Sequence, residues 1–201
     1  MIARLPLVRL IAVIVLGWFG SGFAQAARFS TVIIDPGHGG RDKGAYWGGV
    51  RESTLNLKVA KELEKLFKKR GIRTVMTRRS DVFVSLQNRA AIANRYRSAV
   101  FVSIHFNAST NTSIKGAETY YWGRTGGMMA AAIQRRLPAR VQTRNRGPRR
   151  HGFTVLTQTR CPAVLVECGF ISNSRERMRC STTWYQQTAA RAMYDGLMAC
   201  R

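Results

Sequence analysis

Short apolar runs recur along the chain and predict the strands of a buried sheet. They cover residues 32–34, 99–104 and 163–166, and β-branched side chains are frequent in them. Runs of this length favour strands over helices, and apolar runs without polar alternation are typical of strands that are covered on both faces. Residues 72–77 alternate between polar and apolar positions, and residues 117–122 form a further predicted strand.

Helical periodicity lies between these strands. Apolar residues at positions 55, 59, 63 and 66 predict a helix whose other face carries lysines, with Ser53 or Thr54 as its cap and Gly71 as its end. A strand, a helix and a second strand in succession predict a right-handed crossover, and therefore an α/β fold with a mostly parallel sheet. Helices are also predicted at 86–97, 126–137 and 185–197, with inner faces made of Leu86, Ala90 and Ala93 in the first and Tyr185, Ala189, Ala192 and Met193 in the last.

Four other segments lack a long periodic pattern. Residues 41–50 are rich in glycine and predict a loop over the strand ends, with Tyr46 and Trp47 expected to contact substrate. Residues 140–150 are dense in arginine and predict an exposed basic loop, which we also expect to contact substrate. A short strand is predicted at 155–156 and a turn at 169–174.

Residues 1–26 have the pattern of a signal peptide. Arg4 and Arg9 form a basic region, an apolar stretch follows, and Ala24-Gln25-Ala26 predicts cleavage after Ala26. Residues 27–201 would then form one exported domain, located in the periplasm or secreted. An uncleaved membrane anchor is the alternative, although the apolar stretch is short for a membrane span.

The chain is strongly basic, with a formal charge of +23, of which Arg4 and Arg9 contribute two, leaving +21 on the mature chain. Such a charge attracts anionic polymers. No aromatic and basic motif typical of nucleic-acid binding is present, and export makes anionic envelope polymers or the carboxylates of peptidoglycan the expected partners. We expect a monomer with no stable membrane span after signal cleavage.

Four cysteines lie in the last quarter of the chain, at positions 161, 168, 180 and 200. An oxidising compartment is compatible with one or two disulfides, and two disulfides could form in three connectivities. The spacings lack the close pairs of a structural zinc site.

Two histidines follow predicted strands. His38 comes after the first strand and the Pro36-Gly37 break, and His105 comes directly after residues 99–104. Because the carboxyl ends of parallel strands meet at one edge of the sheet, both histidines are expected there. Together with Glu52 at a helix start they make a two-histidine, one-carboxylate set, which is the ligand number of a catalytic zinc ion. Simple capping of the helix is the alternative for Glu52.

Glu167 follows the apolar strand 163–166. Burial of a carboxylate raises its pKa toward the range of a general base or acid. A buried salt bridge to an arginine is the alternative role. His151 lies among arginines without a preceding strand, so we do not expect it to bind metal.

At these residues the sequence resembles the zinc-dependent N-acetylmuramoyl-L-alanine amidases, the family that includes the bacterial cell-division amidases. The resemblance covers nearly all of the mature chain in the segments VIIDPGHGG, RESTLNL, TRRSD, FVSIHFNAS, AVLVECGFISNSRE and WYQQ. It implies a three-layer α/β/α domain, zinc bound by His38, Glu52 and His105, and Glu167 as the catalytic glutamate. The cell-division members carry a long insertion with an autoinhibitory helix after the strand that matches 117–122, which this sequence lacks, so that mode of regulation is not expected.

The sequence therefore predicts an exported zinc amidase that cleaves the bond between N-acetylmuramic acid and the L-alanine of the stem peptide. A basic envelope-binding protein without turnover is one alternative. A zinc peptidase that acts within the stem peptide is another, and only the family resemblance disfavours it.

Overall fold

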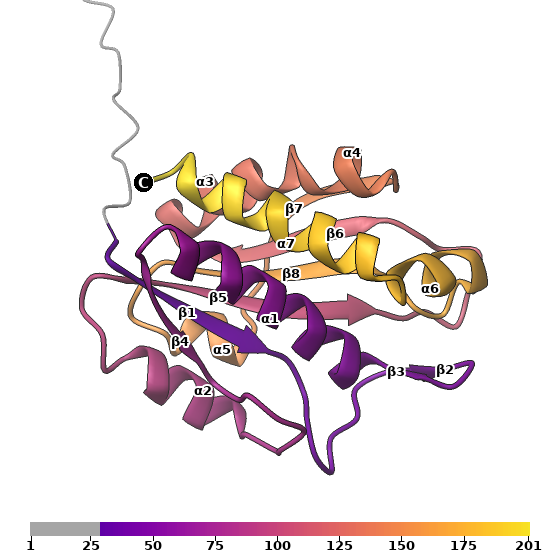
Figure 1. Cartoon of the computed structure of the whole chain (residues 1–201), viewed down its shortest axis with the longest axis horizontal. Helices are drawn as coiled ribbons and strands as arrows, with labels where there is room; N and C mark the ends of the chain where they lie inside the picture. The colour runs from indigo at the N-terminus through magenta and orange to yellow at the C-terminus, as the bar shows by residue number, and fades with distance from the viewer. Residues whose placement is uncertain (1–28) are drawn as a thin grey trace, which may run out of the picture.

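A six-stranded sheet forms the centre of the computed structural model, which describes residues 29–201 (Figure 1). The strands lie in the order β4, β1, β5, β8, β6, β7. The first four are parallel, β6 runs antiparallel to β8, and β7 is parallel to β6. Their bounds are β1 Thr31–Pro36, β4 Arg73–Met76, β5 Ala99–Asn107, β6 Ala117–Trp122, β7 Asn145–Arg150 and β8 Ala163–Phe170; a separate hairpin pairs β2 Tyr46–Trp47 with β3 Val50–Arg51.

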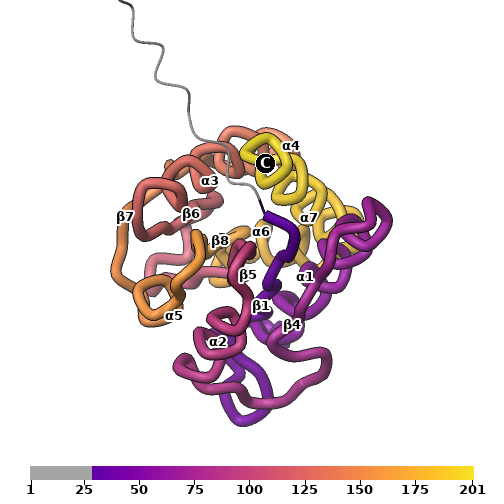
Figure 2. Tube along the Cα trace, turned by 90° about the vertical axis from the view of Figure 1, so that its left-hand side faces the viewer, coloured from indigo at the N-terminus to yellow at the C-terminus, as the bar shows by residue number. Residues whose placement is uncertain are grey.

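Helices cover both faces of the sheet, as the end view in Figure 2 shows. One face carries α1 Glu52–Lys69, α3 Arg124–Gln134, α4 Leu137–Val141 and α7 Thr183–Met198, and the other carries α2 Leu86–Ala93 and α5 Thr154–Thr157. The remaining helix, α6 Ser174–Cys180, follows β8. The predicted α/β class with a mostly parallel sheet is therefore confirmed.

The two faces bury different amounts of apolar surface. The face under α1, α3 and α7 holds most of the buried apolar residues, among them Ile34, Ile104 and Val166. The opposite face holds a small cluster that includes Phe101 and Leu165, packed near α2 and α5. Because successive side chains of a strand point to opposite faces, the same strands contribute residues to both apolar clusters.

Several predictions for the second half of the chain are wrong. Residues 145–150 form the edge strand β7 rather than a basic loop, because their backbone pairs with β6. Residues 155–156 lie in the short helix α5 instead of a strand. Helix α6 was not expected; Asn173 caps it by accepting a hydrogen bond from the Glu176 amide. The predicted turn at 169–174 partly belongs to β8, which continues to Phe170.

The helix boundaries differ in detail from the predictions. Helix α1 begins at Glu52, so its N-cap is Arg51, and Ser53 and Thr54 lie inside it; Gly71 follows its end as predicted. The predicted inner residue Leu86 is 50% exposed, and α2 ends at residue 93. The helix predicted at 126–137 is divided between α3 and α4, the predicted loop 41–50 contains the β2–β3 hairpin, and strand β5 continues through residue 107.

The predicted signal peptide, residues 1–26, lies outside the described residues. Within 29–201, no helix is both long enough and apolar enough to span a bilayer. In this range the cysteines at 161, 168, 180 and 200 are all free, and the last three are buried. The disulfides that an oxidising compartment would allow are therefore not formed in this structure.

Candidate metal centre and active site

The backbone after β1 places His38 at the carboxyl edge of the sheet. His38 has a positive φ of 58°, which is uncommon for a residue other than glycine. Arg89 Nη2 donates to the His38 carbonyl at 2.8 Å, and His38 Nδ1 lies 2.8 Å from Asp42 Oδ2. A Cβ on Gly37 would lie 2.2 Å from ring atoms of His105, so only glycine allows the two histidines to approach each other. Gly37 is therefore a requirement of the site.

Glu52 joins the two histidines. Its Oε1 lies 3.2 Å from His38 Nε2 and 2.9 Å from His105 Nδ1. Its other oxygen, Oε2, accepts a hydrogen bond from the Ala45 amide at 2.9 Å, which orients the carboxylate. One donor atom from each of the three residues lies within 4.8 Å of the others. The structure thus brings together His38, Glu52 and His105, which lie far apart in the sequence.

The charges of this cluster suit a cation. Burial acts to raise the pKa of Glu52, but hydrogen bonds and charge interactions with His105 and His38 hold it well below its usual range. Burial acts to lower the pKa of His38, and the neighbouring Glu52 and Asp42 outweigh this effect and raise it. Two imidazole nitrogens and one carboxylate oxygen are donors that zinc prefers, and Asp42 orients the His38 ring as outer partners of zinc ligands do. These residues therefore fit a zinc ion.

Glu167 lies beside this cluster on the next strand. It is the register partner of His105 across the parallel pair β5 and β8, so the two side chains are on the same face of the sheet. Its Oε2 atom is shielded from solvent and has no hydrogen-bond partner among the described residues. Burial, together with the charges of Glu52 and Glu118, raises the pKa of Glu167 well above its usual value. No arginine forms an ion pair with Glu167 within residues 29–201, which argues against the alternative structural role.

A cavity of about 490 Å³ opens onto these groups. One part of its lining is polar and consists of His38, His105 and Glu167, while Phe83 and Phe153 contribute an apolar wall. An apolar wall beside a few convergent polar groups is the usual composition of a small-molecule binding site. A reacting bond in this cavity would lie between the candidate metal cluster and the carboxylate of Glu167.

Sequence reasoning missed a buried polar network under the site. Arg89 Nη1 lies 2.7 Å from Asp35 Oδ1, and Arg78 Nη2 donates to the carbonyls of Gly37 and Ser53, each at 2.8 Å. Together these groups hold the loop that carries His38 to the start of α1. Asp35 could have indicated this network from the sequence, because a charged residue inside an apolar strand requires a partner. Arg78 and Arg89 had no comparable signal of their own.

The predicted substrate contacts are not part of this cavity. Tyr46 and Trp47 lie in strand β2 and do not line it. His151 is outside the candidate metal cluster and packs on Phe153, with 4.2 Å between the ring centroids.

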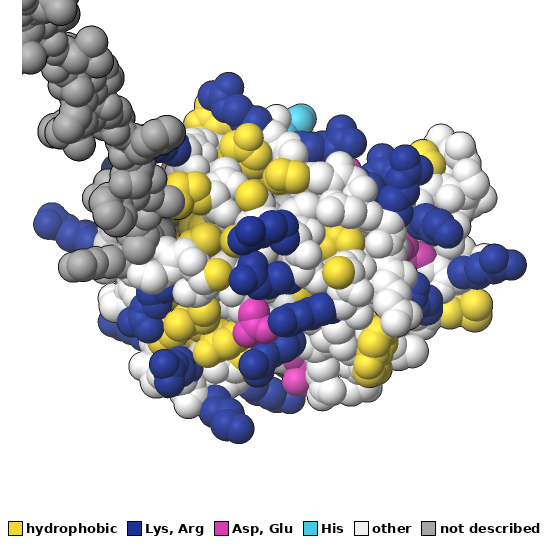
Figure 3. Space-filling model, turned by 90° about the horizontal axis from the view of Figure 1, so that it is seen from above, with side chains coloured by type: hydrophobic (Ala, Val, Ile, Leu, Met, Phe, Trp, Pro, Cys, Tyr) yellow, Lys and Arg dark blue, Asp and Glu magenta, His cyan; other side chains and the backbone are white. Residues whose placement is uncertain are grey.

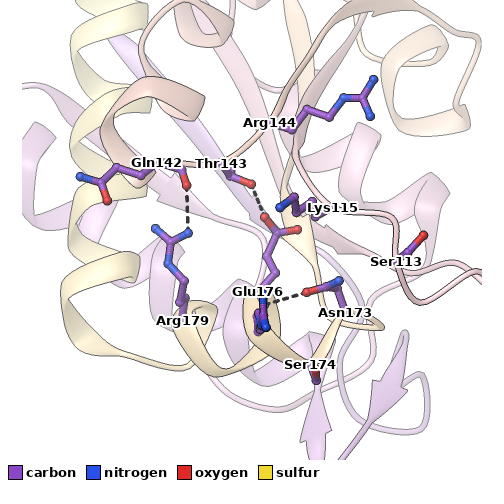
Figure 4. Close-up of a pocket in the computed structure, with 10 residues that line it drawn as sticks. Ser113, Lys115, Gln142, Thr143, Arg144, Asn173, Ser174, Glu176 and Arg179 are labelled. Atoms are coloured by element: carbon purple, nitrogen blue, oxygen red, sulfur yellow. Dashed lines mark hydrogen bonds between the residues drawn. The ribbon is translucent and has the colours of Figure 1, made fainter.

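A second pocket, of about 690 Å³, is lined by polar and basic residues (Figure 4). Glu176 is the acidic residue in it, and that carboxylate already accepts hydrogen bonds from the amides of Gly116 and Phe170. Arg144 points away from Glu176, and its side chain has no hydrogen-bond or ion-pair partner among residues 29–201. None of the predicted metal-binding or catalytic residues lines this pocket.

Comparison with known proteins decides the family. Residues 32–199 match the family described as N-acetylmuramoyl-L-alanine amidase. The chain belongs to this family. Among solved structures, an N-acetylmuramoyl-L-alanine amidase from Clostridium difficile 630 is 36% identical, with a TM-score of 0.81 over 86% of this chain and 96% of that one. The catalytic domain of the amidase CwlV from Bacillus (Paenibacillus) polymyxa var. colistinus is 32% identical, with a TM-score of 0.82 over 86% of this chain and all of that one.

Among curated relatives, the N-acetylmuramoyl-L-alanine amidase LytC of Bacillus subtilis is 36% identical over 173 residues. That match covers 84% of this chain and 35% of LytC, so the chain spans about a third of the relative. The predicted family and enzyme class are confirmed: the chain is a peptidoglycan amidase with the fold of the amidase catalytic domain.

Proposed function

We propose that this amidase is an exported zinc hydrolase that cleaves the bond between N-acetylmuramic acid and the L-alanine of the stem peptide. The observation that carries the proposal is the convergence of His38, Glu52 and His105 beside the free oxygen of Glu167. In this assignment the three residues bind zinc, and Glu167 is the catalytic glutamate. The ligand set leaves room for a further oxygen ligand, which amide hydrolysis requires.

Each group then has a defined task. When bound, zinc supplies a Lewis acid that polarises a carbonyl and lowers the pKa of water. The carboxylate of Glu167 accepts the proton of the attacking water and returns it to the nitrogen of the leaving L-alanine. The high pKa of Glu167 falls toward that of an effective base when a cation offsets the charge of Glu52. Asp42 and Arg89 keep His38 in place throughout.

Export and surface charge give the enzyme access to its substrate. Residues 1–26 act as the signal peptide, and residues 27–201 form the catalytic domain in the periplasm or outside the cell. The face seen in Figure 3 carries many lysine and arginine side chains and few acidic ones. This charge supports binding to peptidoglycan and to other anionic envelope polymers, with the enzyme acting as a monomer.

Mass spectrometry of peptidoglycan incubated with the metal-free and the zinc-loaded enzyme tests the proposal. Free stem peptides that begin at L-alanine, released only with zinc, are the expected products. Cuts within the stem would instead indicate the zinc peptidase. Absence of any product with the zinc-loaded enzyme would indicate a binding protein without turnover. Release of stem peptides by the metal-free enzyme would contradict zinc dependence.

A further inference from the structure

One row of side chains crosses the sheet beside the candidate active site. His105 on β5 is the register partner of Glu167 on β8, and Glu167 is the register partner of Glu118 on β6. Register partners on adjacent strands lie on the same face. The row therefore leads from a metal-binding residue through the catalytic glutamate, both in the cavity lining, to Glu118 beyond that lining, and strand β7 lies next to Glu118.

Glu118 is a buried carboxylate that holds two arginines of β7. Its Oε2 lies 3.2 Å from Arg146 Nε and 3.3 Å from Arg149 Nε. Its Oε1 accepts hydrogen bonds from Asn107 Nδ2 and the Tyr120 hydroxyl, both at 2.9 Å. These four donors fix the carboxylate, and the carboxylate in turn fixes the orientation of both guanidinium groups.

Both arginines use only the Nε atom for this pairing. Within residues 29–201, the terminal amino groups of Arg146 and Arg149 donate no hydrogen bond. The Arg149 side chain is 52% exposed and that of Arg146 is 22% exposed. Two guanidinium groups around one carboxylate leave a net positive charge with free paired donors, which is the arrangement that binds an external carboxylate in bidentate fashion.

The spacing matches the substrate of this enzyme. Neighbouring strands lie about 4.8 Å apart, so the row from His105 to Glu118 covers about 10 Å. An extended dipeptide spans about 7 Å, which leaves about 3 Å, the length of one hydrogen bond, to the end of the row, where Glu118 holds the two arginines. A stem peptide whose amide to the sugar lies at the metal would therefore bring its second residue, a γ-linked glutamate in its unmodified form, toward these arginines.

We propose that Arg149, supported by Arg146 and oriented by Glu118, binds the free α-carboxylate of the second stem residue. The enzyme then prefers stems with D-isoglutamate at this position over stems with the uncharged D-isoglutamine. This inference rests on the proposed function. It requires the bound stem peptide to extend from the metal site toward β7. The second pocket, which contains the unpaired Arg144, is the competing location for the carboxylate.

Two sets of substrates that differ only in this group test the proposal. Soluble glycan strands with tripeptide stems are prepared in D-isoglutamate and D-isoglutamine forms, and kcat and KM are measured for each. We expect the wild type to favour the carboxylate form by about tenfold in kcat/KM, the scale of one charge-assisted contact at a partly exposed site. Arg149→Gln should lose this preference through a higher KM with little change in kcat, because the contact is remote from the reacting bond.

Matched variants separate the subsite from a general effect of charge. Arg149→Lys should retain part of the preference, because it keeps the charge and loses the bidentate geometry. Arg144→Gln removes the same charge from the second pocket and should leave the preference unchanged. An unchanged preference in Arg149→Gln, or a lost preference in Arg144→Gln, would contradict the proposal. Equal kcat/KM values for the two forms in the wild type would do the same.

A binding measurement keeps this test independent of turnover. Calorimetry compares the dipeptides L-alanyl-D-isoglutamate and L-alanyl-D-isoglutamine with the zinc-loaded enzyme. Tighter binding of the charged dipeptide, lost in Arg149→Gln, supports the subsite even if no stem peptide is released from glycan strands. Equal affinities would overturn the subsite, whereas absence of L-alanine-terminated products would count only against the proposed function.

Discussion

The two faces of the central sheet serve different purposes, although the same strands build both. Toward α1, α3 and α7 the strands present Ile104 and Val166, which belong to the main apolar core. Toward the other face the next residues of the same strands, His105 and Glu167, line the candidate active-site cavity. On these two strands, residues that stabilise the core therefore alternate with residues that serve the candidate site, while Glu52 reaches that site from the first turn of α1.

This separation shows why the site tolerates groups that cost stability. A buried carboxylate without a partner, as in Glu167, is unfavourable and persists only where other interactions exceed its cost. The Asp35–Arg89 ion pair belongs to both categories. It is a buried structural contact, and it also supports the loop that carries His38. The comparison predicts opposite outcomes for substitutions on the two faces.

The largest effect is expected at the candidate metal cluster. His105→Ala should lose both zinc and activity while the domain still folds, because the main core does not contain this side chain. Zinc content, activity and circular dichroism on one sample measure this outcome. His151→Ala is the matched control, since this histidine is exposed and outside the cluster, and it should retain zinc. Stoichiometric zinc in His105→Ala would remove the residue from the ligand set.

On the apolar face, truncation should reduce stability rather than catalysis. Leu63 in α1 is fully buried in the main core, and Leu63→Ala should lower the free energy of unfolding by about 2–5 kcal/mol. The activity per folded molecule should stay close to that of the wild type. Urea unfolding combined with assays at low temperature measures both quantities. A large loss of specific activity without a loss of stability would contradict the division between the faces.

Glu167→Gln should reduce catalysis rather than stability, which is the opposite of the result expected for Leu63→Ala. The amide keeps the shape of the side chain but cannot accept the water proton, so kcat should fall by about a hundredfold or more. Zinc should remain bound, because the three ligands are intact. Metal analysis and rates on one preparation distinguish this outcome from that of a ligand variant, which would be depleted of metal and partly rescued by added zinc. A rate near that of the wild type would require another base.

The smallest effect is a pH dependence of stability in the metal-free protein. Burial raises the pKa of Glu167 in the folded state above the usual value of 4.5, so the folded state holds this proton more tightly than the unfolded state. The stabilisation is complete below pH 4.5 and is lost as the pH rises through the folded-state pKa. Glu167→Gln does not titrate, so its stability relative to the wild type should increase from pH 4 to pH 8. Denaturant unfolding in the presence of a chelator measures this difference, and a constant difference would show that burial does not perturb the group.

The sequence by itself determined the central parallel strands of the sheet and singled out the candidate reactive residues. Continuous apolar runs before Asp35, His105 and Glu167 marked the central parallel strands, because strands buried on both faces leave no polar alternation. The rule that parallel strands end at one edge then predicted that the histidines would meet. Charged residues next to such runs indicated candidate site residues, since a buried charge requires a function or a partner.

Only the tertiary structure decided what holds these residues and what surrounds them. Segment 145–150 has no apolar pattern and became strand β7 through backbone pairing with β6, which side-chain periodicity does not report. The contacts of Arg78 and Arg89 with the loop before His38 depend on segments distant in sequence that converge after folding. The same holds for the pairing of Glu118 with Arg146 and Arg149, because charges on an unfolded chain give no information about which of many arginines lies beside one buried carboxylate.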